Sequence, residues 1–88
     1  MNHEFRKIMG MELECWWHKS CAAEIGVGDD WATLYLIQSR EKRKGHAEEL
    51  LIEAKKYYKE QGKELRGSVA LNSGMKKLYQ KLDIKEYN

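Results

Sequence analysis

The chain has 88 residues, a formal net charge of +2 at neutral pH and an apolar content of 42%. This length predicts a single domain spanning 1–88 with a small core, and the apolar content argues against a disordered chain. The small net charge argues against a dedicated nucleic-acid-binding protein, in which a larger basic excess usually gathers on one face. No apolar stretch reaches membrane length and no signal-peptide pattern opens the chain, so we expect a cytoplasmic protein with no membrane partner.

The first part of the chain predicts a β-hairpin. Residues 1–10 have mixed polarity without a clear period, and we expect either a frayed helical turn or a disordered arm there. Apolar and polar residues then alternate over 11–17 and again over 21–27, on either side of a short polar break. In the first of these predicted strands the alternation places three residues on one face, Leu13, Cys15 and Trp17.

A central strand and a long helix follow. Residues 31–37 are apolar on both faces, which is typical of a central strand covered on both sides. Residues 46–61 carry apolar side chains at spacings of three and four, which predicts an amphipathic helix ending near Gly62. Even spacing of apolar residues predicts another strand over 64–71.

The last elements complete an α/β (α+β) fold. Asn72 or Ser73 is placed to cap a C-terminal helix that runs to Leu82, and residues 84–87 are a candidate for a short final strand. The sheet is expected to be mixed and mostly antiparallel, with helices covering it. The exception is one β-α-β crossover, which makes the strands at 31–37 and 64–71 parallel.

The turn between the central strand and the long helix predicts an anion site. A strand that passes through a glycine into a helix leaves backbone N–H groups unpaired at the positive end of the helix dipole. Four cations crowd this turn, and they are unfavourable there unless a negative group lies among them; they are Arg40, Lys42, Arg43 and Lys44. Glu48 and Glu49 supply part of that charge, but a bound phosphate would do so better. The turn is therefore predicted to hold the diphosphate of a cofactor.

Two motifs in this order carry a family resemblance. The turn is Lys42-Arg43-Lys44-Gly45-His46-Ala47, and the C-terminal helix begins Asn72-Ser73-Gly74-Met75 and continues through Leu78-Tyr79 to Leu82. The chain resembles the GNAT superfamily of acyl-CoA-dependent N-acetyltransferases, whose cofactor motif is Gln/Arg-x-x-Gly-x-Gly/Ala and whose C-terminal segment reads Asn-x-x-Ala-x-x-Leu-Tyr-x-Lys-Leu-Gly-Phe. Lys42 replaces the usual Gln or Arg, Met75 replaces Ala, and Asp83-Ile84 replaces Gly-Phe. The resemblance covers Trp31 to the C-terminus.

The resemblance implies transfer of an acetyl group from acetyl-CoA to a primary amine by direct attack in a ternary complex. Backbone N–H groups would hold the CoA diphosphate, with Lys42 closing the turn; they belong to Arg43, Lys44, Gly45, His46 and Ala47. Backbone groups of Tyr35, Leu36 and Ile37 would pair with the pantetheine arm between two parallel strands that splay apart, and the Ile37 amide would face the thioester oxygen. Asn72 would hydrogen-bond the same arm, and Tyr79 would protonate the departing thiolate.

Several alternatives stay open. Glu24, His18 and Glu14 are equal candidates for a general base, and water is another. Cys15, His18 and Cys21 have metal-like spacing, but zinc normally needs a fourth ligand, so two reduced thiols without a metal are expected.

The sequence defines the binding site for the amine acceptor least well. Only 30 residues precede Trp31, where the family has a strand and two helices. The acceptor groove is then open to a peptide or protein amine, or closed by a second subunit in a homodimer, or the chain binds CoA or a protein partner without catalysis. Three tryptophans in so small a domain slightly favour a second subunit. A basic patch at 40–44 that binds nucleic acid is a weaker alternative.

Overall fold

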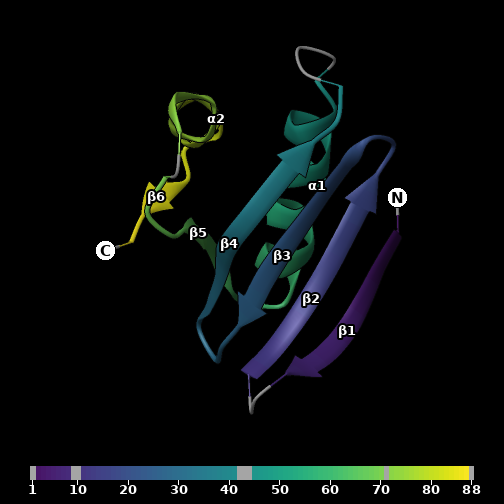
Figure 1. Ribbon diagram of the computed structural model, residues 1–88. Coiled ribbons are helices and arrows are strands. Elements are labelled where there is room, and N and C mark those ends of the chain that lie inside the picture. Colours follow the sequence, from purple (N-terminus) through teal and green to yellow (C-terminus); the bar gives the residue numbers. More distant parts are fainter. Residues whose placement is uncertain (1, 9–10, 42–44, 71, 88) are drawn as a thin grey trace.

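The structure is a computed structural model that describes residues 2–8, 11–41, 45–70 and 72–87. It is a small α+β fold of eight elements (Figure 1). In chain order these are β1 (Asn2–Ile8), β2 (Met11–His18), β3 (Cys21–Val27), β4 (Trp31–Ser39), α1 (His46–Glu60), β5 (Glu64–Gly67), α2 (Ser73–Leu82) and β6 (Lys85–Glu86).

The six strands form one mixed sheet in the order β1-β2-β3-β4-β5-β6. Neighbours from β1 to β4 are antiparallel, whereas β5 runs parallel to β4 through the α1 crossover, as predicted. The short β6 is also parallel to β5, so the expectation that the rest of the sheet is antiparallel is wrong there. The reason is that α2 forms a second crossover and returns the chain to the same end of the sheet.

The N-terminal segment is a strand and not the helical turn or arm expected for residues 1–10. β1 pairs with β2 along its whole length, from Asn2↔Trp17 to Ile8↔Met11. The His3 ring stacks on the Trp16 ring, with centroids 4.4 Å apart. Pairing with a neighbouring strand stabilises a segment whose own sequence has no period, which is why local reasoning missed it.

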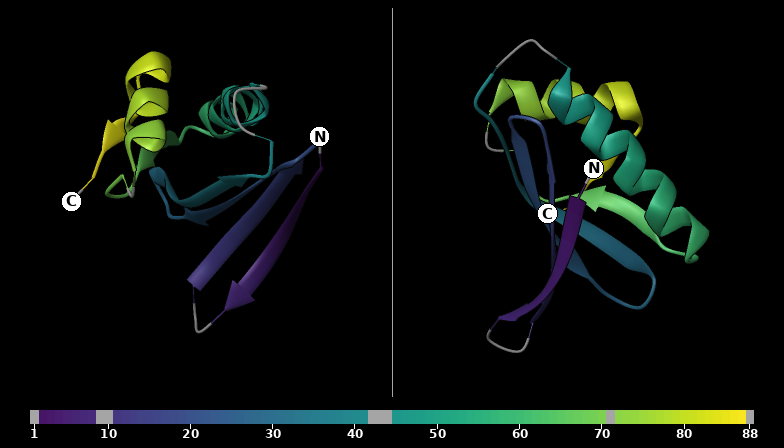
Figure 2. Two further views of the ribbon diagram at one scale, coloured as in Figure 1. Left: turned by 45° about the horizontal axis from the view of Figure 1, so that its top comes forward. Right: turned by 90° about the vertical axis from the view of Figure 1, so that its right-hand side faces the viewer.

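Both helices pack on the same face of the sheet, as the two views in Figure 2 show. We call this the helix-covered face and the opposite one the open face. Along β4, Ala32 and Leu34 on the helix-covered face are fully buried, whereas Trp31 and Tyr35 on the open face are 37% and 44% exposed. The prediction that both faces of this strand are covered is therefore wrong: its second apolar face lies under no helix among the described residues.

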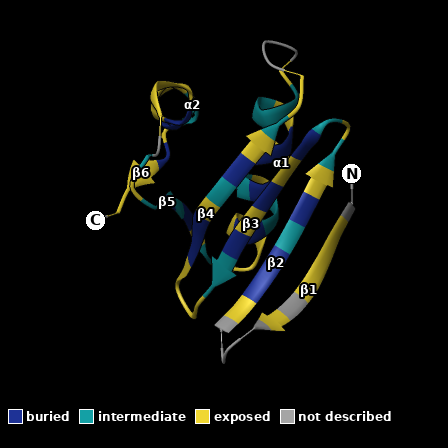
Figure 3. Cartoon of the chain, viewed as in Figure 1, coloured by how far each residue is buried: buried dark blue, intermediate teal, exposed yellow. Residues whose placement is uncertain are grey.

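The core lies between α1, α2 and the helix-covered face (Figure 3). The Trp16 side chain of β2 is 5% exposed, and its Nε1–H donates to the buried Tyr58 hydroxyl of α1 at 3.0 Å. The three residues predicted to share a face of β2 do so, but register with β3 places them on the open face; they are Leu13, Cys15 and Trp17. Among the described residues, no helix is long and apolar enough to cross a membrane.

The helix ends follow the sequence signals. α1 begins directly after Gly45, which has a φ of 77°, and the chain leaves it through Gly62, which has a φ of 76°. Only glycine adopts such a conformation without steric cost. α2 is capped by Asn72, whose Oδ1 accepts a hydrogen bond from the Met75 N–H at 2.9 Å. These local contacts fix where each helix starts, and both starts lie at one end of the sheet (Figure 1).

Candidate functional site

A groove of about 840 Å³ lies between the end of β4 and the starts of α1 and α2. We call it the helix-end groove. It brings together five of the residues predicted to bind a cofactor, which come from three separate parts of the chain; they are Ile37, Gly45, His46, Ala47 and Asn72. Tyr35 and Leu36 lie in the same strand as Ile37 but do not line the groove.

The groove exists because β4 and β5 separate. β5 pairs with β4 only from Trp31↔Glu64 to Leu34↔Gly67, and the last contact is the Ser68 N–H donating to the Leu34 carbonyl at 2.9 Å. β4 continues to Ser39, paired with β3 on its other side. Among the described residues, no strand covers the β5-side edge of β4 beyond Leu34.

A β-bulge bends β4 at the point of separation. Ile25 of β3 lies opposite Leu34 and Glu24 lies opposite Leu36, so Tyr35 is one residue in excess. A bulge of this kind sharpens the local twist and turns a strand away from its neighbour. The two parallel strands thus diverge where the predicted pantetheine contacts of 35–37 begin.

The start of α1 presents unpaired backbone donors to this groove. The first intrahelical hydrogen bond runs from the Glu49 N–H to the Gly45 carbonyl at 3.0 Å. The N–H groups of the three preceding residues therefore have no acceptor within the helix. A Cβ on Gly45 would meet no atom of the described residues within 4 Å. The rest of the predicted turn, Lys42, Arg43 and Lys44, lies outside the described residues.

The two carboxylates in the first turn of α1 already have cationic partners elsewhere. Glu49 Oε2 lies 3.3 Å from His18 Nε2, and this hydrogen bond, together with Lys19, lowers the pKa of Glu49. Glu48 pairs with Lys81 of α2 at 3.0 Å. Glu48 also lines the helix-end groove, so one acidic side chain lies beside the predicted anion position.

The His46 ring has a contact that sequence reasoning missed. Its Nδ1 lies 2.7 Å from the Ser20 hydroxyl, in the turn between β2 and β3. No local signal connects residues 26 positions apart. The contact fixes the imidazole at the wall of the helix-end groove, whereas the sequence suggested a role for the His46 backbone alone.

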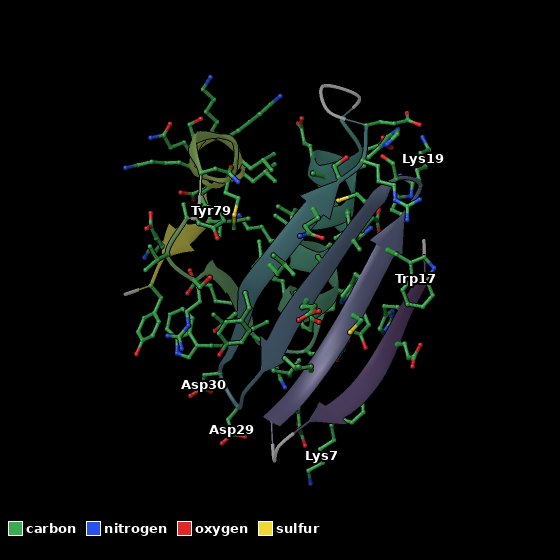
Figure 4. All side chains as sticks on the ribbon, in the orientation of Figure 1. Lys7, Trp17, Lys19, Asp29, Asp30 and Tyr79 are labelled. Carbon is green, nitrogen blue, oxygen red and sulfur yellow. The ribbon has the colours of Figure 1, made fainter. Side chains whose placement is uncertain are left out.

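Tyr79 is buried below the groove. Its hydroxyl donates to the Ser68 carbonyl at 3.1 Å, one residue past the last pairing between β4 and β5. Its ring packs on Gly67, where a Cβ would lie 2.3 Å from Tyr79 Cζ. Burial raises the pKa of Tyr79, and the hydrogen bond to Ser68 opposes that rise. Figure 4 shows Tyr79 directed from α2 toward the sheet. Tyr79 lies next to the point where β4 and β5 separate, but it does not line the groove. The Asn72 side chain, which was predicted to bind the cofactor, caps α2.

None of the three candidate bases lines the groove, but the His18 ring packs edge-on against His46, which does, with ring centroids 6.2 Å apart. Glu14 is 7% exposed on the helix-covered face; its Oε2 lies 3.4 Å from His3 Nε2 and has no hydrogen-bond partner among the described residues. Glu24 is exposed on the open face, and His18 binds Glu49.

The cysteine and histidine spacing does not produce a cluster. Cys15 pairs with Glu24 and lies on the open face, whereas Cys21 lies in the core with Ala23, so the two thiols point to opposite sides of the sheet. Burial raises the pKa of Cys21 to about 11. Among the described residues, no three His, Cys, Asp or Glu side chains are grouped to hold a metal ion.

A second groove, of about 420 Å³, lies on the open face. We call it the open-face groove. Its lining includes Trp31, Thr33 and Tyr35 of β4, Gly26 of β3 and Arg66 of β5. No sequence motif predicted this groove, because its walls are formed by residues from five separate strands.

Comparison with known protein families, with curated proteins and with solved structures found no match for this chain. The chain is therefore assigned to a class by its own geometry: a small α+β protein with a mixed six-stranded sheet, two helices and a groove at the helix starts.

Proposed function

We propose that this protein is a GNAT-like N-acetyltransferase that transfers an acetyl group from acetyl-CoA to a primary amine. The observation that carries the proposal is the helix-end groove, where Ile37, Gly45 and Asn72 surround the gap left by β4 and β5. As part of this proposal the protein acts in the cytoplasm, where its two free cysteines, Cys15 and Cys21, stay reduced.

The groove fits a CoA molecule in three respects. A Cβ on Gly45 meets no atom of the described residues within 4 Å, so none of these residues blocks a diphosphate at that position. The N–H groups at the start of α1 and the positive end of the helix dipole favour an anion. The β5-side edge of β4 offers backbone donors and acceptors to an extended amide chain, as a neighbouring strand would.

Backbone and side-chain groups of this protein would then assist acyl transfer. Bound acetyl-CoA supplies the thioester that a neutral amine attacks. Alignment of the two reactants in the groove lowers the barrier, and a preorganised backbone N–H, assigned to Ile37, stabilises the oxyanion. Tyr79, like any phenol, carries its proton at neutral pH, and burial raises its pKa further; it can donate that proton to a thiolate once its bond to Ser68 breaks. Since none of the candidate bases lines the groove, we assign no base to the chain, and the amine arrives neutral or loses its proton to water.

A second candidate function is a module that binds CoA, or a protein partner, without catalysis. The position of Tyr79 favours it, because the hydroxyl is already bonded to Ser68 and the ring does not line the groove. A homodimer is compatible with either function, since a second subunit could cover the open face. Native mass spectrometry would report the subunit count and any co-purified CoA together.

Calorimetry with acetyl-CoA tests the cofactor site. Gly45→Glu places a side chain and a negative charge at the proposed diphosphate position, so we expect no measurable binding. Gly62→Glu is a matched control, because Gly62 has nearly the same φ and equally open surroundings at the other end of α1. We expect that control to keep wild-type affinity within about twofold. Wild-type affinity in Gly45→Glu would contradict the site.

Turnover on a panel of amines separates the two functions. We expect the wild type to acetylate at least one amine and Tyr79→Phe to lose about 10²-fold or more in kcat, the usual scale of a lost general acid. Tyr57→Phe, on α1, controls for loss of a hydroxyl. CoA binding without turnover would favour the binding module, and an unchanged Tyr79→Phe would remove Tyr79 from the mechanism.

A further inference from the structure

Arg66 is held rigidly on the open face by three contacts. Its Cζ lies 4.6 Å from the centre of the Trp31 ring and 3.8 Å from the centre of the Tyr87 ring. Its Nε–H donates to Thr33 Oγ1 at 3.0 Å. Cation–π contacts and this hydrogen bond order a side chain that would otherwise be flexible.

The charge of Arg66 has no anionic partner in the described part of the chain. No carboxylate there lies within ion-pair distance of its guanidinium group. Glu86, from the neighbouring β6, accepts a hydrogen bond from the Ala70 N–H at 3.2 Å. Lys7 and Glu12 also line the groove, but they are opposite in sign and face each other across β1 and β2. The charges that line the groove therefore sum to +1, located on Arg66.

The remaining donors of Arg66 suit a carboxylate. Since Nε is bonded to Thr33 and the faces of the guanidinium plane meet aromatic rings, the two Nη groups are the donors left for a ligand. Their fixed spacing matches the two oxygens of a carboxylate, which arginine commonly binds in a bidentate manner.

The walls of the groove limit the ligand to a small one. The Tyr35 ring lies directly on Gly26, where a Cβ would be 2.4 Å from Tyr35 Cε2, so the absence of a side chain there lets the ring lie flat. Trp31 and Tyr35 give the groove two aromatic surfaces. Its volume of about 420 Å³ falls at the lower end of the range for small-molecule sites, roughly 300–1,000 Å³.

We propose that the open-face groove binds the carboxylate of a small, peptide-sized ligand, with Arg66 holding the carboxylate and the rings of Trp31 and Tyr35 contacting the rest. This inference rests on the contacts of Arg66 and not on the proposed acyl transfer. Tyr35 belongs both to this groove and to the bulge where β4 leaves β5.

A nitrogen–proton NMR titration with trialanine tests the carboxylate. The Trp31 indole and Arg66 Nε resonances report the site directly, and we expect both to shift with trialanine and at least tenfold more weakly with trialanine amide. A capped tripeptide amide with a central glutamate distinguishes the source of the carboxylate, because binding there assigns a side chain and binding by trialanine alone assigns a chain end. If neither peptide shifts these resonances, or inorganic phosphate binds as tightly as either, the proposal fails.

Two variants test the role of Arg66. Arg66→Lys keeps the charge but removes the planar pair of donors, and we expect at least tenfold weaker trialanine binding. Thr33→Val keeps Arg66 and both rings but removes the acceptor that orients Nε, and we expect a severalfold loss. Lys59→Gln, on the exposed side of α1, controls for the loss of one positive charge. Wild-type affinity in both Arg66→Lys and Thr33→Val, with dispersed spectra, would overturn the proposal. Because acetyl-CoA binding is measured separately, this failure is distinguishable from failure of the cofactor site.

Discussion

Both faces of the sheet carry large apolar side chains, but the surroundings of these side chains differ. On the helix-covered face Leu34 and Ile25 are completely buried, whereas on the open face Trp17, Trp31 and Tyr35 are between 37% and 44% exposed. The difference shows that alternation of apolar residues predicts a strand and its two faces, but does not predict which face a helix covers. A fully packed face stabilises the fold, and an apolar face without a helix is available to a ligand or a second chain.

The two grooves differ in the same way. The helix-end groove lies at three backbone features: the glycine before α1, the capped start of α2 and the strand edge of β4 that β5 leaves unpaired. The open-face groove is formed by side chains around Arg66. A helix start can be recognised in the sequence by its glycine or its capping residue. A site formed by side chains from several strands has no sequence motif by which it can be recognised.

The largest expected contrast between the faces lies within β4. Leu34→Ala removes a fully buried side chain on the helix-covered face, and we expect a loss of about 2–5 kcal/mol in the free energy of unfolding. Leu36→Ala makes the same change on the open face, where the side chain is half-buried, and should cost about 1 kcal/mol or less. Urea denaturation of both variants measures this, and equal losses would mean that the open face is also packed.

A pair of glycines gives the next contrast. Gly67 and Gly26 each contact a tyrosine ring, but Tyr79 over Gly67 is 4% exposed and Tyr35 over Gly26 is 44% exposed. In Gly67→Ala the buried ring has no space to move, and we expect a loss of about 1–3 kcal/mol. In Gly26→Ala the exposed ring can rotate away, so the loss should stay below about 1 kcal/mol. A larger loss in Gly26→Ala than in Gly67→Ala would reverse the assignment of the faces.

The hydrogen bond between Trp16 and Tyr58 gives an effect of similar size within the helix-covered face. Tyr58→Phe leaves the buried indole N–H without its acceptor, which should cost about 1–3 kcal/mol in thermal or urea unfolding. Tyr57→Phe, at the half-buried neighbouring position, should cost less than about 0.5 kcal/mol. A neutral Tyr58→Phe would mean that another group satisfies Trp16.

Chemical labelling of the two cysteines compares the two faces without a substitution that would alter the stability of the fold. Cys21 is 1% exposed and its pKa is raised to about 11, so at pH 8 roughly one molecule in a thousand carries the reactive thiolate. Cys15 is partly exposed on the open face. We expect iodoacetamide to label Cys15 at least tenfold faster than Cys21 in the native protein, and both similarly in urea, as read by mass spectrometry.

The sign of the Cys21 shift also predicts a pH dependence. Because its folded pKa lies above the ordinary value of 9.0, the unfolded chain loses this proton first. Its contribution to stability is therefore complete below about pH 9 and is lost as pH rises toward 11. The free energy of unfolding should fall less steeply over this range in Cys21→Ala, and an identical slope would contradict the shift.

Much of the fold follows from local sequence. The alternation over 11–17 and 21–27, the three-and-four spacing of α1, the glycine at each end of that helix and the Asn72 cap all predicted elements that the structure contains. These features depend on backbone conformation and on contacts within a few residues. The meeting of Gly45, Ile37 and Asn72 was expected from the family resemblance, and these three residues line one groove.

The sequence by itself determined the helices, most of the strands and the parallel crossover, because periodicity, caps and connection length act over short distances. Only the tertiary structure decided that residues 2–8 form an edge strand, that both helices take one face, that β5 ends at Gly67 and that Tyr79 is buried against it. It also brought Arg66 between Trp31 and Tyr87. Each of these depends on pairing or packing between distant segments, for which a single strand or helix carries no signal.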